Sequence, residues 1–233
     1  MNPTAIRRLV VSLAVGFWAL EHPTAAAADD DGPGAAPEST LFELDPVMDG
    51  AIVGSGFVLG LTLEFILHTG ELAPQPPGDP DKLLGIDRWR ATDTETSPPG
   101  LSNIGRGIIV AYTLGDSVLV DLLDRGDPWY HYVVIYLQSW GITLALTDIT
   151  KIAVRRPRPI AYHEVQETGM AGVTTDRAVS FFSGHASVSA ALAATATYFA
   201  FTRPASALER WLVFVGGLGV VTLVSVQRVL EGR

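Results

Sequence analysis

Five long apolar stretches dominate the chain after residue 50, and the segments between them are rich in proline, glycine and charge. They are Ala51–Leu67, Leu101–Leu123, Trp129–Val154, Ser183–Phe201 and Trp211–Val226. None of them alternates apolar and polar residues with the two-residue period of a half-buried strand. Long continuous apolar runs are typical of helices that are buried in a bundle or embedded in a membrane. We therefore predict an all-α bundle of about five helices, membrane-embedded or exported.

The first 50 residues follow a different pattern. Arg7 and Arg8 precede a short apolar run, Leu9–Leu20, and small residues at Ala25–Ala28 precede three aspartates. This order is typical of a cleaved export signal, with an uncleaved membrane anchor as the alternative. The expected organisation is a signal peptide at 1–28, an acidic linker at 29–50, N-terminal helices with a proline-rich loop at 51–128, and a core that carries the chemistry at 129–233.

Composition narrows the function further. Hydrophobic residues make up 48% of the chain and charged residues only 18%, and the mean hydropathy is +0.28, which favours membrane helices. The formal net charge of −9 argues against nucleic acid as a partner, because binding its phosphates requires a cationic face. The chain has no cysteine, so disulfides, thiolate zinc sites and cysteine nucleophiles are excluded.

Three short polar stretches lie at the ends of successive apolar runs. The first, Lys151–Pro159, holds four cations, and its two prolines must end the helix near Arg155 or Arg156. The second, Ser183–His185, places an N-cap serine, a glycine and a histidine where free backbone N–H groups attract anions. The third, Gln227–Arg233, closes the fifth run.

Each stretch alone has a simpler interpretation: basic residues at a membrane edge, an ordinary capped helix, and a cationic helix end. If the helices run antiparallel, however, all three meet on one side of the bundle. Cations, backbone donors and a histidine suit a phosphate group, because they neutralise its charge and supply a proton. Asp148 precedes Lys151 by three residues, so it is expected either to pair with this lysine or to act in the site directly.

The order and spacing of these residues resemble the type 2 phosphatidic acid phosphatase superfamily, which includes lipid phosphatases, bacterial class A acid phosphatases and vanadium haloperoxidases. The matching positions are Lys151, Arg158 and Pro159 in the first motif, Ser183, Gly184 and His185 in the second, and Arg228 in the third. Phe182 stands where the second motif usually has proline, and Gln227 where the third has serine. The resemblance covers Trp129–Arg233.

This resemblance implies a role for each matching residue. The phosphate would be held by Lys151, Arg158, Ser183, Gly184 and Arg228, and His185 would protonate the leaving oxygen. The family's nucleophile is a second histidine, which follows the third-motif arginine after five residues and is oriented by an aspartate four further on. The given sequence contains neither position, and none of His22, His68, His131 and His163 has a convincing helix-end context to replace it. We therefore expect a truncated phosphatase without its sixth helix, which binds phosphate weakly, turns over little or nothing, and is thus inactive as a catalyst in this chain.

The leading hypothesis is thus a phosphatase that acts on a lipid or isoprenoid phosphate ester, through a phosphohistidine in the full-length family. The resemblance implies no metal and no other cofactor, and we expect membrane lipids but no obligate protein partner around it. One alternative is a non-catalytic membrane helical protein, and another is a vanadium-dependent haloperoxidase, with vanadate in the phosphate site. A soluble, exported bundle like the class A acid phosphatases is an alternative to the membrane fold.

Charged loops give a prediction for membrane topology. The loop Thr202–Glu209 is flanked by Arg203 and Arg210, which predicts a cytoplasmic position and puts the site at the outer or periplasmic face. A cleaved signal followed by three spanning runs would instead put the site inside. One early run is therefore expected not to cross, either Ala51–Leu67 or Leu101–Leu123.

Overall fold

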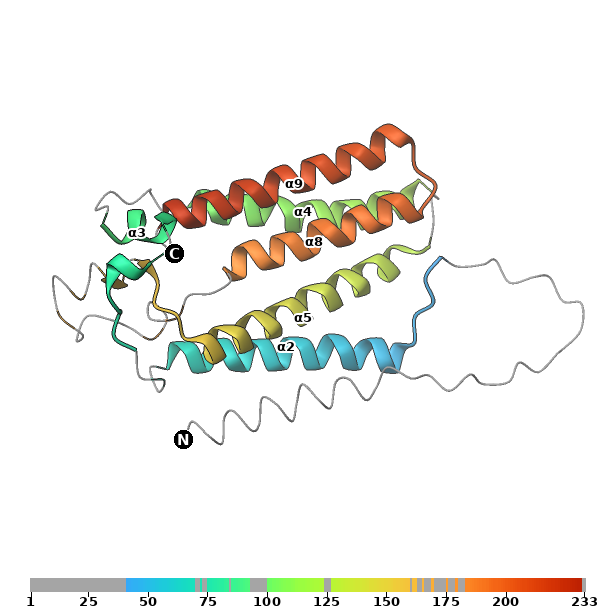
Figure 1. The fold of residues 1–233 in the computed structure, drawn as a ribbon. Coiled ribbons are helices and arrows are strands. Elements are labelled where there is room, and N and C mark those ends of the chain that lie inside the picture. Colours follow the sequence, from blue (N-terminus) through green and yellow to red (C-terminus); the bar gives the residue numbers. More distant parts are fainter. Residues whose placement is uncertain are drawn as a thin grey trace, which may run out of the picture. The chain divides into compact units, whose positions relative to one another are not determined.

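Five long helices form an up-and-down bundle (Figure 1). The computed structural model describes residues 41–69, 72, 75–83, 85–92, 100–123, 127–159, 161, 162, 165, 169, 175, 179 and 183–231. The long helices are α2 (Pro46–His68), α4 (Leu101–Leu122), α5 (Trp129–Val154), α8 (Gly184–Thr202) and α9 (Ala207–Leu230). A 3₁₀ turn, η1 (Pro80–Lys82), and a short helix, α3 (Gly85–Thr92), lie between α2 and α4. The described residues form no strand, and the predicted all-α fold is confirmed.

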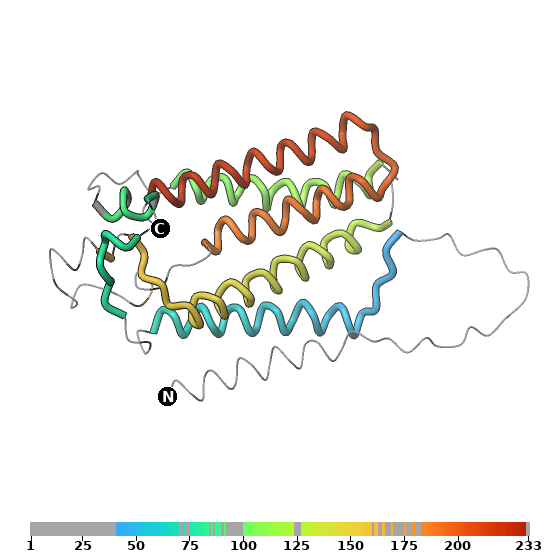
Figure 2. The backbone as a smooth tube through the Cα atoms, viewed as in Figure 1, coloured from blue at the N-terminus to red at the C-terminus, as the bar shows by residue number. Residues whose placement is uncertain are grey.

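The helices alternate in direction along the bundle. The C-terminal ends of α2, α5 and α9 therefore lie at the same end as the N-terminal ends of α4 and α8 (Figures 1 and 2). Helix α2 packs on α5, α5 on α8 and α8 on α9, while α4 packs against α5, α8 and α9. This arrangement brings the three polar stretches of the sequence to one end of the bundle, as we predicted for helices that run antiparallel.

The start of α2 differs from the sequence-based expectation. The helix begins at Pro46, five residues before the predicted run, because the Asp45 side chain accepts hydrogen bonds from the backbone N–H groups of Val47 and Met48, and proline suits a first helical turn. Residues 46–50 are therefore helical rather than part of the acidic linker. The predicted signal peptide and residues 29–40 lie outside the described residues.

Glycines let α2 and α5 approach each other closely. A Cβ atom on Gly56 would lie 2.9 Å from the backbone carbon of Gly141, so no larger residue fits without moving one helix. One turn later, a Cβ atom on Gly60 would lie 2.7 Å from the side chain of Leu144. Small residues at a helix contact are typical of bundles that gain stability from close packing rather than from water exclusion.

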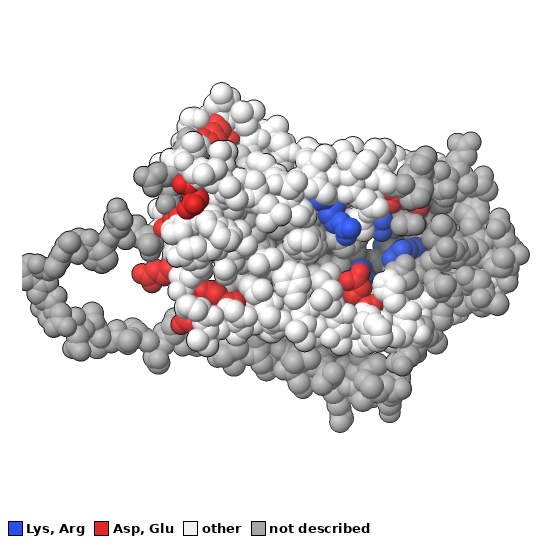
Figure 3. All heavy atoms as spheres, turned by 180° about the vertical axis from the view of Figure 1, so that it is seen from behind, with Lys and Arg blue, Asp and Glu red and all other residues white. Residues whose placement is uncertain are grey.

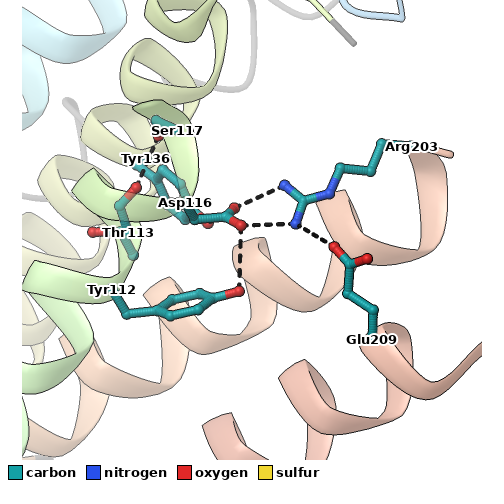
Figure 4. Close-up of polar contacts among 7 residues, drawn as sticks. All are labelled: Tyr112, Thr113, Asp116, Ser117, Tyr136, Arg203 and Glu209. Atoms are coloured by element: carbon teal, nitrogen blue, oxygen red, sulfur yellow. Dashed lines mark hydrogen bonds and ion pairs between the residues drawn. The ribbon is translucent and has the colours of Figure 1, made fainter. Parts of the chain in front are cut away.

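Aromatic residues fill the centre of the bundle between α5 and α8. Tyr132 and Phe199 have no exposed surface, and their rings meet edge to face with centroids 4.9 Å apart. Beyond this core, a buried ion pair joins α4 to the C-terminal end of α8. The guanidinium of Arg203 lies against both carboxylate oxygens of Asp116, at 2.7 and 3.0 Å, with Glu209 beside it (Figure 4).

The outer surface of the bundle is strongly apolar. Among the helices that the structure describes, three are long and apolar enough to cross a membrane: α2, α5 and α9. Of the most apolar 18-residue window of α9, only 11% is buried inside the protein, so most of its apolar side chains face outward. The sequence proposed that one early run does not cross. Helix α4, which covers the run Leu101–Leu123, is not among the three, but neither is α8, and both follow the bundle axis like the others (Figure 1), so the number of crossings stays a prediction.

Candidate functional site

The four cations of the basic stretch Lys151–Pro159 have different partners. Helix α5 ends at Val154, and its C-cap Arg155 adopts a left-handed backbone conformation with φ of 50°. The Arg155 Nε donates to the carbonyl of Ile152. Arg156 forms an ion pair with Asp87 of α3. These contacts explain how four cations can lie close together, because two of them serve the local structure and only Lys151 and Arg158 face the site.

A cavity of about 370 Å³ opens at this end of the bundle. Its wall contains all six residues predicted from the sequence: Lys151, Arg158, Ser183, Gly184, His185 and Arg228. Figure 3 shows Lys and Arg side chains gathered around a hollow on one face of the molecule, with acidic side chains next to them. Among the residues that the structure describes, no three His, Asp or Glu side chains are close enough together to hold a metal ion.

Lys151 enters the cavity from the last turn of α5. Its Nζ lies 2.7 Å from Oδ1 of Asp148, so the pairing expected from their spacing is present. The Asp148 side chain is only 1% exposed, and its other oxygen, Oδ2, is buried without a hydrogen-bond partner among the described residues. Lys151 also lies beside the start of α8, since a Cβ atom on Gly184 would be 3.7 Å from its Nζ. The ammonium therefore lies between a fixed carboxylate and a helix N-terminus.

The start of α8 provides the backbone donors of the cavity. Ser183 is the N-cap, and its side chain accepts from the N–H of Ala186. Arg228, near the end of α9, donates from Nε to the Ser183 hydroxyl at 3.2 Å. The carboxylate of Glu231 accepts from Arg228 at 3.1 Å and from the buried Ser102 hydroxyl of α4 at 2.9 Å. This chain of contacts fixes Arg228 against the first turn of α8.

Two further contacts orient the remaining predicted residues. The His185 Nε2 lies 2.7 Å from the side-chain oxygen of Asn103, at the start of α4, which fixes the plane of the imidazole. Arg158 donates from Nε to the carbonyl of Val179 at 3.2 Å, so the extended segment after α5 is tied to the chain that leads to α8. Helices α5, α8 and α9 and the segment after α5 thus supply donors around the cavity, which is what a bound phosphate requires.

The sequence analysis missed the contribution of the first two long helices. Glu64 and His68 of α2 and Arg106 of α4 also line the cavity. His68 was not expected to have a helix-end context, whereas it is the last residue of α2 and lines the cavity. Glu64 and His68 are the only charged or titratable residues between Ala51 and His68. They are four residues apart, so they share one face of a helix, and this spacing was the signal in the sequence that could have identified them.

Some predicted positions are not part of the described structure. His163, Phe182 and Arg233 lie outside the described residues. Gln227 is described, and its side-chain oxygen is buried without a hydrogen-bond partner among the residues described, away from the cavity wall. Of the two positions that depart from the family pattern, only Gln227 is described, and it does not line the cavity.

The comparisons with known proteins agree with this geometry. Residues 132–233 match the model of the PAP2 superfamily. No curated protein and no solved structure matches the chain. The matched segment carries every one of the six predicted site residues, and the structure brings them to a single cavity at one end of an all-α bundle. Residues 132–233 of this chain therefore belong to the PAP2 superfamily.

Proposed function

We propose that the chain is a phosphatase that binds a lipid or isoprenoid phosphate ester in this cavity and hydrolyses it. Membership of residues 132–233 in the PAP2 superfamily supports a phosphatase-type function in general. The observation that carries the proposal is that six residues from three separate motifs line one cavity of about 370 Å³. A cavity of this volume matches a small ligand or the head of a larger one.

The distribution of charge suggests where each part of the ester lies. The phosphate oxygens accept from Lys151, Arg158 and Arg228 and from the first N–H groups of α8, which together offset the charge of the ester and of the transition state. His185 supplies the proton that the leaving oxygen needs. The rate is best measured with enzyme in excess over substrate, so that a single turnover can be detected.

A lipid substrate is supported by the rest of the cavity wall. Phe57 and Leu61 of α2 and Trp140 and Leu144 of α5 line it on one side. Leu61 is 55% exposed, so this apolar wall continues onto the outer surface of two helices that qualify as membrane spans. An acyl or isoprenyl tail attached to the phosphate can extend along this apolar wall into the surrounding lipid. A fully polar ester has no apolar group to pack against the wall. We further propose that the site lies at the outer or periplasmic face.

The proposal is tested by comparing two arginine variants that lose the same charge. Arg158→Ala removes a cation from the cavity, whereas Arg210→Ala removes one at the opposite end of the bundle. Loss of charged hydrogen bonds of about 1.5–3 kcal/mol predicts that Arg158→Ala weakens vanadate or phosphate binding by roughly 10- to 100-fold. Arg210→Ala should bind as the unchanged chain does.

Substrate choice is measured with a short-chain phosphatidic acid, an isoprenyl monophosphate and p-nitrophenyl phosphate. We expect faster hydrolysis of the two lipid esters. Equal vanadate binding by Arg158→Ala and the unchanged chain, together with no hydrolysis of any ester, would contradict the proposal and favour the non-catalytic alternative. Halide oxidation in the presence of vanadate and peroxide would favour the haloperoxidase instead.

A further inference from the structure

The first two turns of α4 contact residues of the site, although this helix lies outside the segment that matches the family. The Ser102 hydroxyl donates to the carboxylate of Glu231, which also accepts from Arg228. The side-chain oxygen of Asn103 lies 2.7 Å from Nε2 of His185. Helix α4 therefore borders the phosphate site, next to the histidine that we assign to the leaving oxygen.

Arg106 brings a further cation to this side of the cavity. It follows Asn103 by three residues, so the two side chains lie on the same face of α4, and it lines the cavity. Its guanidinium is exposed and makes no ion pair or hydrogen bond with the residues that the structure describes. The helix packs closely on α9 at this level, since a Cβ atom on Gly105 would lie 2.6 Å from the side chain of Val224. This packing fixes the turn, and the guanidinium is left to bind a group from the cavity.

The α4 and α2 walls of the cavity differ in charge. The α4 wall carries Arg106, whereas the α2 wall carries the carboxylate of Glu64. The apolar side chains of Phe57 and Leu61 also lie on the α2 wall. An anionic group is attracted to the first wall and repelled by the second, and an apolar tail packs on the second. Because His185 contacts α4, a leaving oxygen that it protonates lies on the α4 side of the cavity.

We propose that Arg106 binds a second anionic group, which the leaving group carries, and that the site therefore prefers a lipid diphosphate to the monophosphate of the same alcohol. The inference rests on the proposed phosphatase function. The terminal phosphate lies on the three cations of the motifs and the inner phosphate on Arg106, whose planar guanidinium can donate two parallel hydrogen bonds to phosphate oxygens. Pockets of about 300–1,000 Å³ ordinarily hold whole small ligands, so a cavity of about 370 Å³ has room for both phosphates.

The charge of the leaving group gives Arg106 a part in the reaction as well as in binding. In a diphosphate, the bond between the terminal phosphorus and the bridging oxygen breaks, and this oxygen leaves as part of the lipid monophosphate. Negative charge grows on the leaving phosphate as the bond breaks, and Arg106 offsets it. The net reaction adds one water across the broken bond and gives inorganic phosphate and a lipid monophosphate, so no other reactant is consumed.

The test compares ligands with one and with two phosphorus groups. Inorganic phosphate and methylenediphosphonate, whose P–C–P bridge cannot be hydrolysed, are titrated into the full chain and followed by calorimetry. The variant is Arg106→Gln, and the matched control is Arg156→Gln. Arg156 lies at the same end of the bundle, but it pairs with Asp87 and does not line the cavity. Because Arg106 is exposed, its replacement should leave the unfolding midpoint unchanged.

We expect the unchanged chain to bind methylenediphosphonate more tightly than phosphate. Loss of one charged hydrogen bond predicts that Arg106→Gln weakens diphosphonate binding by about tenfold and phosphate binding by less than about threefold. Arg156→Gln should keep the ratio of the two affinities, because it removes a charge near the cavity but no contact within it. In single-turnover hydrolysis, the ratio of the rates for geranyl diphosphate and geranyl monophosphate should fall by about tenfold in Arg106→Gln.

Two results would overturn the assignment and leave the proposed function standing. If Arg106→Gln weakens the binding of both ligands equally, Arg106 is a general cation of the cavity and selects no second phosphate. If it weakens neither, Arg106 binds no part of the ligand. In both cases phosphate binding that is lost in Arg158→Ala still supports the phosphate site. If the unchanged chain and Arg158→Ala bind phosphate equally, the proposed function fails, and this inference fails with it.

Discussion

The buried pair of Arg203 and Asp116 is expected to be the most sensitive point of the fold. Each side chain is only 4% exposed, and the guanidinium contacts both carboxylate oxygens (Figure 4). Burial alone would lower the pKa of Arg203, but the hydrogen bonds and charge of Asp116 raise it, so the arginine stays charged. Replacing Asp116 by asparagine therefore leaves a buried cation without its main counter-charge.

The structure sets the size of this effect. Removing one partner of a buried ion pair costs about 3–5 kcal/mol. Glu209 lies 3.3 Å from the Arg203 guanidinium and still offsets part of its charge, so we expect the lower end, about 3 kcal/mol. For a chain of this length each kcal/mol shifts the unfolding midpoint by about 2–4 °C, which predicts a fall of roughly 6–12 °C for Asp116→Asn.

The assay is thermal unfolding followed by circular dichroism in detergent. Asp121→Asn is the matched control, because Asp121 is an exposed aspartate on the same helix. Its oxygen accepts from the N–H of Trp129 at 3.3 Å, which an asparagine oxygen can also do, so the free energy of unfolding should change by less than about 0.5 kcal/mol. The double variant Asp116→Leu with Arg203→Met removes both charges and should recover most of the loss. A midpoint shift below about 2 °C for Asp116→Asn, or a double variant as unstable as the single one, would refute the reasoning.

Two further predictions concern helix packing and orientation. Gly56→Ala should destabilise the bundle by about 1–3 kcal/mol in the same unfolding assay, because its Cβ would meet the backbone of Gly141, whereas Gly54→Ala has nothing within 4 Å and should be neutral. The chain has no cysteine, so single cysteines are clean reporters of membrane sidedness. A membrane-impermeant maleimide should label Thr69→Cys, at the site end, from outside and Ala205→Cys only after permeabilisation. The reverse pattern would contradict the proposed outer face.

The sequence by itself predicted most of the helical framework. Long apolar runs set the five helices, and local chemistry set several ends, such as the serine cap at Ser183 and the exit from α5 at Arg155. Capping, proline and periodicity operate within three or four residues, so they can be recognised without knowledge of the fold. The order of the three motifs likewise identified the six cavity residues, because antiparallel helices bring alternate helix ends together.

Only the tertiary structure decided which partners these side chains have. Arg203 was interpreted as a loop cation, yet it is buried against Asp116, 87 residues earlier in the chain, so it also joins two helices inside the bundle. Arg156 similarly pairs with Asp87 rather than facing the cavity.

His68 joins the cavity for the same reason. The turn that ends α2 carries it to the end of the bundle where α5 and α8 meet, and no pattern near residue 68 predicts that meeting. The strength of a charge or of an imidazole as a base depends on the groups that surround it in space. Those groups come from helices far apart in the sequence, so helix packing decides them, and the local sequence does not.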